Sequence, residues 1–325
     1  MTQLAQNGYF PSVSIVIPVY NGMRTLRPCL DAIFQQDYPR ERYEVIAVDN
    51  NSVDGSPEFL RQYPLRLEFE REIQGPHAAT NTGVRVATGE ILVFTDSDCV
   101  PEPDWLRKLV APFSDECIIG TGGRIEAYRP QTRIERFLDA MKPFKNAYQG
   151  SPDFPAALVT GNCAIRRAEF MAAGMFNPNM YTGAETDLSY RVQLQTGKRA
   201  CYVQDAVVYH MYNPTLKRLA RHFYIYGYSE ILLGTIYKDT PGYPWPPRVQ
   251  AGVMVRQIGA LVTYAGSLIY RTLTYPFRRG VDKDYLWWPI LWMVVESNNL
   301  RGKLEGLAVT RFYRRKFWEE GVRVI

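Results

Sequence analysis

Residues 90–98 read EILVFTDSD, an apolar run that ends in two carboxylates. A run this short, bounded by polar turn residues, is typical of a strand buried on both faces. Strands of that kind belong to parallel sheets that are covered by helices. The stretch therefore predicts a buried strand over residues 90–95, with Asp96, Ser97 and Asp98 at its carboxyl end.

The same pattern occurs twice upstream. Residues 13–19 read VSIVIPV and residues 43–48 read YEVIAV, and each run stops at a polar turn. Between them, residues 26–36 place apolar side chains at helical spacing. This alternation predicts an α/β fold with a doubly wound, mostly parallel sheet. Ligands of such sheets bind beyond the carboxyl ends of the strands, so the turns there mark the candidate site.

Further elements continue the alternation. Strand patterns occur near residues 65–70 and 200–209. Helical patterns and helix-boundary signals cover residues 56–62, 78–87, 104–113, 135–144 and 185–197.

Charge divides the chain near residue 212. The 325 residues carry a net charge of +5, but residues 1–212 sum to −4 and residues 213–325 to +9. We therefore expect an acidic α/β domain over residues 1–212, followed by a basic helical C-terminal extension over residues 213–325. With 46% hydrophobic and 22% charged residues, the composition excludes an intrinsically disordered chain.

Cysteines and the N-terminus indicate the compartment. Five scattered cysteines without a C-x-x-C pair favour reduced thiols over a disulfide framework or a zinc site. The first ten residues lack the basic start and apolar run of a signal peptide. We therefore expect a cytoplasmic protein.

The extension holds five of the six tryptophans and two charge-free apolar windows, residues 257–270 and 285–295. A membrane-spanning helix needs about 20 apolar residues, so neither window is expected to span. Membrane-plane helices, a re-entrant hairpin and buried core helices all remain open. The basic, Trp-rich composition favours attachment to an anionic membrane surface. Packing within the chain or in a homo-oligomer is the alternative, and without a recognition motif no nucleic acid is expected as a partner.

The clearest chemical signal is the pair Asp96 and Asp98. Two carboxylates on a strand-to-loop turn suit Mg²⁺ or Mn²⁺, which also takes oxygens from a substrate phosphate. A solvated turn is the alternative for such a short motif. His210 follows the last apolar strand, and it is either a packed residue or a third ligand for a metal bound at Asp98.

Two other polar groups lie at element ends. Asp49, Asn50 and Asn51 follow a core strand, where they form either an Asx turn or hydrogen bonds to a nucleobase. Glu185 and Asp187 open a predicted helix. They either complement the helix dipole or include a general base.

Six motifs in this order carry a family resemblance. Over residues 12–212 the chain resembles the family 2 glycosyltransferases, which have the nucleotide-diphospho-sugar transferase fold called GT-A. The matching stretches are SIVIPVYNG, VIAVDNNSVDGS, NTGVRVATGEILVFTDSDCVPEPDWL, GNCAIRR, TGAETDLSYRVQLQTGKR and VVYH.

The resemblance implies a role for each matching residue. The donor nucleotide would contact Pro18, Tyr20, Asn21, Asp49, Asn50, Asp96 and Ser97. The sugar or acceptor would contact Trp105, Gly161, Asn162 and Asp187. The metal, Mg²⁺ or Mn²⁺, would bind Asp96, Asp98 and His210, and Glu185 would be the catalytic base.

The chain departs from the family pattern at four positions. Glu185 stands where the family has its catalytic aspartate, and Ala184 replaces the glutamate before it. The longer glutamate must reach the acceptor differently. Thr80 stands where many relatives have an arginine beside the diphosphate, which puts that phosphate contact in doubt. Asn50 replaces a second aspartate that is common in the family.

The resemblance implies an inverting, metal-dependent transferase of hexosyl or deoxyhexosyl groups. It would move one sugar from a UDP- or dTDP-linked donor to a hydroxyl of a lipid-linked or surface-glycan acceptor. Its expected place is the inner face of the cell membrane, as a peripheral protein. The chain lacks the Gln-x-x-Arg-Trp signature of processive synthases. A sugar nucleotidyltransferase and a non-catalytic nucleotide-binding scaffold are the alternatives.

Overall fold

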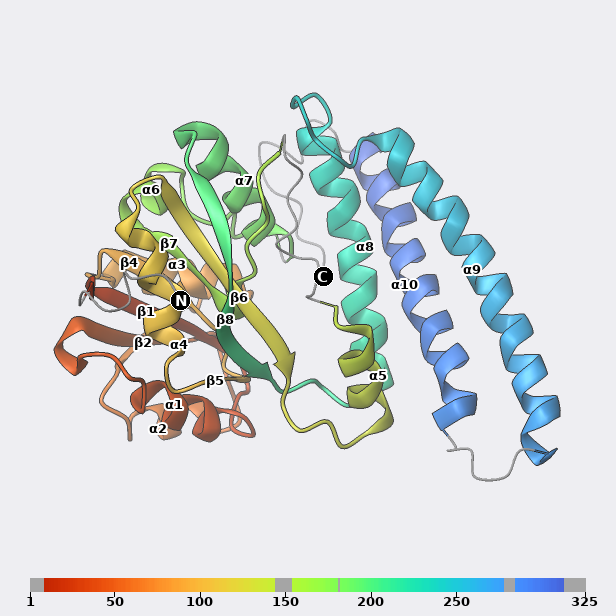
Figure 1. Ribbon diagram of the computed structural model, residues 1–325, viewed down its shortest axis with the longest axis horizontal. Coiled ribbons are helices and arrows are strands. Elements are labelled where there is room, and N and C mark those ends of the chain that lie inside the picture. The colour runs from red at the N-terminus through yellow and green to blue at the C-terminus, as the bar shows by residue number, and fades with distance from the viewer. Residues whose placement is uncertain (1–8, 144–153, 181, 278–283, 313–325) are drawn as a thin grey trace. The chain divides into compact units, whose positions relative to one another are not determined.

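The computed structural model describes residues 9–143, 154–180, 182–277 and 284–312 (Figure 1). The chain forms two compact units. The first holds the residues up to Tyr128 together with Lys142–Met211, and the second holds Arg129–Met141 and the chain from Tyr212 on.

An eight-stranded sheet forms the centre of the first unit, in the order β3-β2-β1-β4-β7-β6-β8-β5. β1 pairs in parallel with β2 and β4, and β2 pairs in parallel with β3. β7 is antiparallel to β4 and β6, whereas β8 is parallel to β6 and antiparallel to β5. The strands are β1 (Val13–Val19), β2 (Tyr43–Asp49), β3 (Arg66–Phe69), β4 (Ile91–Phe94), β5 (Cys99–Pro101), β6 (Ile118–Ala127), β7 (Cys163–Arg166) and β8 (Arg199–His210).

Helices cover this sheet. They are α1 (Leu26–Phe34), α2 (Ser56–Leu60), α3 (Pro76–Val86), α4 (Trp105–Val110), α6 (Arg167–Ala172) and α7 (Ala184–Thr196). α3 packs on β1 and β2. Gly83 makes this close packing possible, because a Cβ there would lie 2.6 Å from Val16 and 2.9 Å from Val48. Apolar side chains of β1 and α1 form much of the hydrophobic core of this unit.

The predicted α/β class with a mostly parallel β1–β4 core is confirmed, and the five expected strands form. Three strands were not predicted: β5, β6 and β7. β6 contains Gly120, Gly122 and Gly123, and glycine weakens the local strand signal. At Gly123 a Cβ would overlap the Ala206 carbonyl and the Asn162 amide, so tight packing selects glycine there.

The second unit is helical. Its helices are α5 (Arg133–Met141), α8 (Leu216–Tyr237), α9 (Pro247–Thr274) and α10 (Asp284–Phe312). α5 joins α10 through Asp284, which pairs with Arg133 at 2.6 Å and with Arg136. The Phe137 ring also packs 5.2 Å from that of Trp292. The division expected at residue 212 therefore missed residues 129–141, which group with the C-terminal helices because of these long-range contacts.

The two apolar windows lie within long helices. Residues 257–270 belong to α9, whose 28 residues extend about 42 Å at 1.5 Å per residue. By length and composition α9 could cross a membrane. The expectation that this window is too short to span was wrong on length, because helix continues at both ends of it. Trp318 and the end of the helix predicted over residues 135–144 lie outside the described residues.

Candidate functional site

The turns after β1 and β2 are bonded to each other at the carboxyl edge of the sheet. The backbone N–H of Asn21 donates to Ser52 Oγ at 2.9 Å, and Val53 N–H donates to Asn21 Oδ1 at 2.9 Å. Asn21 and Asn51 have φ angles of 51° and 64°, a left-handed conformation that asparagine tolerates. The predicted clusters at Asn21 and Asp49–Asn51 thus form one braced surface.

Asp49 leaves an acceptor free on this surface. Its Oδ2 accepts from Ser52 N–H at 3.2 Å, but Oδ1 is buried and has no hydrogen-bond partner among the described residues. A buried polar atom without a partner is costly, so a ligand donor there would be favourable. Nearby Tyr20 is 54% exposed and Pro18 is half-buried, so both can contact a ligand.

Asn50 has a different environment. It is buried, and its Oδ1 accepts from Gly75 N–H at 2.7 Å while its Nδ2 donates to the carbonyls of Glu70 and Ile73. The side chain is therefore used to hold the loop between β3 and α3. We assign Asn50 a supporting role instead of the predicted contact with the nucleotide.

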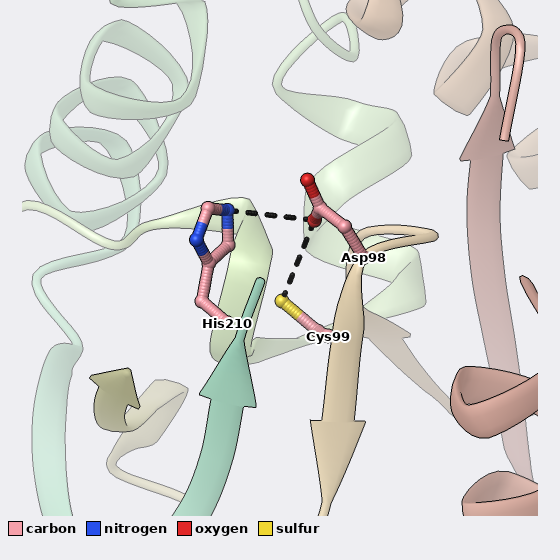
Figure 2. A group of neighbouring side chains, drawn as sticks. All are labelled: Asp98, Cys99 and His210. Carbon is pink, nitrogen blue, oxygen red and sulfur yellow. Dashed lines mark hydrogen bonds and ion pairs between the residues drawn. The ribbon is translucent and has the colours of Figure 1, made fainter. Parts of the chain in front are cut away.

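A second group forms where β5 pairs with β8. The register places Cys99 opposite His210, and the backbone N–H of Met211 donates to the Asp98 carbonyl at 2.8 Å. This pairing brings His210 Nε2 to 3.4 Å from Asp98 Oδ1 (Figure 2). The Cys99 sulfur lies 4.0 Å from the same oxygen. One ligand atom from each of the three residues falls within 4.8 Å of the others, a spacing suited to a metal ion.

The donor set fits a hard divalent cation through two of these residues. Burial, reinforced by the carboxylates of Asp98 and Asp96, raises the pKa of Cys99 well above its usual value. A neutral thiol is a poor ligand for Mg²⁺ or Mn²⁺. Burial and the Asp98 carboxylate also raise the pKa of Asp96 to about 7. Besides burial, the raised pKa reflects the repulsion between the neighbouring carboxylates of Asp96 and Asp98, and a bound cation would neutralise their negative charge.

The short segment before β7, which contains Gly161, lies next to the Asp96 carboxylate. A Cβ at Gly161 would lie 3.3 Å from Asp96 Oδ2, so glycine leaves room for that carboxylate. Behind it, Asn162 and Trp105 are completely buried, and the indole N–H donates to Asn162 Oδ1 at 2.7 Å. Neither side chain presents a surface to a ligand. They support the site instead of contacting the sugar as predicted.

Glu185 lies in the first turn of α7, after Gly183 in a left-handed conformation (φ 79°). Its Oε2 lies 3.2 Å from His77 Nε2 on α3, an ion-pair distance without full hydrogen-bond alignment. Burial alone would raise the pKa of Glu185. Contact with His77 and with the backbone N–H groups of Gly183 and Glu185 outweighs burial, so the pKa lies below its usual value. The carboxylate is therefore ionised at neutral pH.

Sequence reasoning found no role for His77, which the structure places beside the candidate base. Its only local signal was its position just after Gly75-Pro76, where a helix begins. The Asp187 carboxylate instead forms an ion pair at 2.9 Å with Arg191, one turn later on the same helix. That contact gives Asp187 a supporting role in place of the predicted contact with sugar or acceptor.

Thr80 offers nothing to a phosphate. It is buried, and its hydroxyl donates to the Pro76 carbonyl at 2.8 Å. Thr80 therefore does not replace the phosphate contact that an arginine makes at this position in many family members.

Comparison with known proteins decides the family. The glycosyl transferase family 2 model matches residues 14–173. A relative, the glycosyltransferase AglE of Haloferax volcanii, is 32% identical over 220 residues, which are 66% of this chain and 71% of AglE. The chain belongs to glycosyltransferase family 2.

Two further similarities of this family 2 protein extend the comparison. The mannosyltransferase PcManGT of Pyrobaculum calidifontis, solved with GDP-Man and Mn²⁺, superimposes with a TM-score of 0.62 at 23% identity. The match covers 92% of this chain and 88% of that one, and it shows a common fold. The poly(ribitol-phosphate) beta-glucosyltransferase of Bacillus spizizenii is 42% identical over 92 residues, 26% of this chain and 14% of the relative. The predicted GT-A fold and family are confirmed.

Proposed function

We propose that the protein is an inverting, metal-dependent glycosyltransferase that moves one sugar from a nucleoside-diphosphate sugar to an acceptor hydroxyl. One observation carries the proposal. Asp98 and His210 bring their ligand atoms together as a candidate cation site, and the ionised, largely buried carboxylate of Glu185 interacts electrostatically with Asp96, two residues before Asp98. A base and a diphosphate-binding cation site are the two parts that such a transfer needs.

The nucleotide would bind on the braced surface after β1 and β2. The exposed ring of Tyr20 can lie against the base, and the free Oδ1 of Asp49 can accept a hydrogen bond from the base or ribose. The diphosphate would then extend toward Asp96 and Asp98, which follow β4. Support also comes from the common fold with PcManGT, whose structure holds a nucleotide sugar.

Asp98 and His210 would hold the cation, with Asp96 beside them. A bound Mg²⁺ or Mn²⁺ would neutralise charge on the departing nucleoside diphosphate. Remaining coordination positions would be open to phosphate oxygens, since such cations take more ligands than two side chains supply.

Glu185 would accept the proton of the acceptor hydroxyl as that oxygen attacks the anomeric carbon. The attack comes from the face opposite the diphosphate, so one displacement inverts the configuration. Because the carboxylate is ionised at neutral pH, it is ready to act as a base.

A transfer assay tests these roles. Full-length protein is incubated with UDP-, dTDP- and GDP-linked hexoses and deoxyhexoses, with Mn²⁺ or EDTA, and product and free diphosphate are measured. We expect Mn²⁺-dependent turnover that falls on the order of 10²- to 10⁴-fold in Glu185→Gln, with nucleotide binding retained. Asp98→Ala should lose both turnover and metal-dependent nucleotide binding. Normal turnover by both variants would refute the assignment.

The alternatives give distinct results in the same assay. A sugar nucleotidyltransferase would release pyrophosphate from UTP or dTTP plus a sugar phosphate. A non-catalytic scaffold would bind no nucleoside diphosphate in a metal-dependent way when tested by calorimetry.

The acceptor is proposed to be lipid-linked or a surface glycan, reached at the cytoplasmic face of a membrane. The relative in Bacillus spizizenii is named for transfer to a poly(ribitol phosphate), and this supports the glycan class. The helical unit supports the membrane, because the outer face of α9 is apolar. Its exposed side chains include Val255, Ile258, Val262, Ile269 and Leu273.

The interior of the same helical unit contains a polar network beside buried apolar side chains such as Ile231 and Leu291. Lys303 on α10 is 2% exposed, and its Nζ lies 2.9 Å from Glu230 Oε2 on α8. Gln257 on α9 accepts from Lys303 at 3.2 Å and donates to Asn299 at 2.8 Å. A bundle with polar bonds inside and apolar side chains outside is the arrangement expected in lipid, where interhelical hydrogen bonds stabilise the packing.

Glycines bring α8 and α10 together in the way that membrane helices pack. A Cβ at Gly227 would overlap the Asn299 carbonyl, and one at Gly302 would overlap the Tyr224 carbonyl. Small residues at such contacts let helix backbones approach closely without a water-driven hydrophobic core. We therefore propose that the outer face of α9 lies in the apolar part of the membrane, and that the basic residues of the extension face anionic headgroups.

A further inference from the structure

His77, on α3, contacts the proposed base, which lies on α7. Its Nε2 lies 3.2 Å from Glu185 Oε2, and the side chains are 6% and 20% exposed. The other ring nitrogen, Nδ1, is buried and has no partner among the described residues. Among the described residues, the contact with Glu185 is thus the ring's one ion pair or hydrogen bond, and its effect on Asp96 is electrostatic.

The ring is held from behind by an aromatic cluster. Its centroid lies 5.1 Å from that of Phe176, which in turn packs on Phe94 and Phe170. Asn81, one turn further along α3, donates to the Phe176 carbonyl at 2.8 Å and accepts from its N–H at 3.1 Å. His77 and its support therefore come from the same helix.

The helix that carries the proposed base, α7, is hydrogen-bonded to the residues just before Phe176. Arg191 donates to the carbonyls of Ala173 and Met175, the latter at 2.8 Å, and Asp187 pairs with Arg191. Helices α3 and α7 are thereby both tied to residues 173–176. This arrangement fixes the distance between their first turns, where His77 and Glu185 meet.

We propose that His77 is a positioning residue that directs the Glu185 carboxylate toward the acceptor hydroxyl. The inference rests on the proposed function of Glu185 as base. A glutamate has one more rotatable bond than the aspartate of the family, and so more conformations to lose when it is oriented. Contact with a rigid, buried imidazole removes that freedom.

Charge gives His77 a second effect on the same group. Besides His77, Asp96 and Cys163 interact electrostatically with Glu185, and His210 acts on Asp96. Without His77, the backbone N–H groups of Gly183 and Glu185 would still favour the ionised base, but they alone would oppose burial and the Asp96 carboxylate, which disfavour it. Loss of the imidazole should therefore move the acidic limb of the rate profile to higher pH.

The test compares His77→Ala and His77→Gln with the wild type in the full-length protein. Gln keeps an N–H donor near the position of Nε2, so it should restore part of the rate that Ala loses. Arg85→Ala, on the exposed face of the same helix, is the control. Thermal unfolding shows whether each variant folds, and kcat, donor KM and the pH dependence of kcat are measured with Mn²⁺.

We expect His77→Ala to lower kcat by up to about 100-fold, with donor KM nearly unchanged and the acidic limb shifted upward. A raised donor KM at unchanged kcat would overturn the inference and make His77 a phosphate contact. Wild-type kcat and pH profile in His77→Ala would overturn it as well. Glu185→Gln distinguishes failure of the proposed function from failure of this inference. If Glu185→Gln is fully active, the proposed role of Glu185 as base is wrong. If Glu185→Gln is inactive but His77→Ala behaves like the wild type, only the positioning role of His77 is wrong.

Discussion

The Nε2 atom of His210 lies 3.4 Å from Oδ1 of Asp98, although more than a hundred residues separate them in the chain. The contact follows from the antiparallel register of β5 and β8, which sets Cys99 opposite His210. The two proposed ligands thus lie where adjacent strands begin and end, Asp98 just before β5 and His210 at the end of β8, and rigid strands would keep a metal site precise.

His210→Ala should weaken Mn²⁺-dependent binding of nucleoside diphosphates, on the order of 10- to 100-fold, whereas Cys99→Ser should leave it near the wild-type value. The reason is that we propose the imidazole as a ligand, whereas burial raises the pKa of the Cys99 thiol and so keeps it neutral. Calorimetric titration of each variant with UDP and GDP, with Mn²⁺ or EDTA, provides the measurement. Equal losses in both variants would place the thiol among the ligands.

In metal-free protein, the contribution of Asp96 to the free energy of unfolding should fall as pH rises from about 4 to about 7. Asp96 has a pKa of about 7 in the folded state, against about 3.9 for an unfolded chain. Between these values the folded state binds more protons, so its free energy of unfolding falls as pH increases. Asp96→Asn removes this effect.

Thermal unfolding in EDTA at pH 4 and pH 8 measures it. The variant should be stabilised relative to wild type at pH 8, and much less so at pH 4. Mn²⁺ should raise the melting temperature of the wild type most at pH 8. A stability difference that does not change with pH would contradict the assignment of the raised pKa.

Asn50→Asp should lower the free energy of unfolding by about 1–3 kcal/mol, although many family members carry aspartate there. In this chain Nδ2 donates to the Glu70 and Ile73 carbonyls, and a carboxylate would face those oxygens without a donor. Urea unfolding measures the loss. Asn51→Asp is the matched control, since Asn51 is exposed and aspartate tolerates its φ of 64°. Equal effects at both positions would refute the supporting role of Asn50.

Val262→Glu should release the protein from lipid vesicles. Val262 is 70% exposed near the middle of α9, and a charge in the apolar part of a membrane costs about 3 kcal/mol. Flotation with phosphatidylglycerol vesicles in low and high salt tests this. Wild type should remain bound in high salt, because apolar contact is not screened.

Leu194→Glu, at an exposed apolar position on α7, is the control for that experiment and should float like the wild type. Complete release of the wild type by salt would show a purely electrostatic attachment and contradict lipid contact by α9.

Local sequence patterns were sufficient to predict the parallel half of the sheet and the family. The strands at residues 13–19, 43–49 and 91–94 are mostly apolar runs, and the turns after them carry the motif residues. Such features are local, since period and turn chemistry can be read within a few residues.

Which side chains come into contact depends on how the elements pack in three dimensions. Strand order and register brought His210 to Asp98, and the packing of α3 and α7 on residues 173–176 brought His77 to Glu185. Trp105 and Asn162 are completely buried, so they support the site from within the core. Long-range contacts likewise join α5 to α10. Local periodicity does not encode contacts between distant segments, because these depend on the whole set of packed elements.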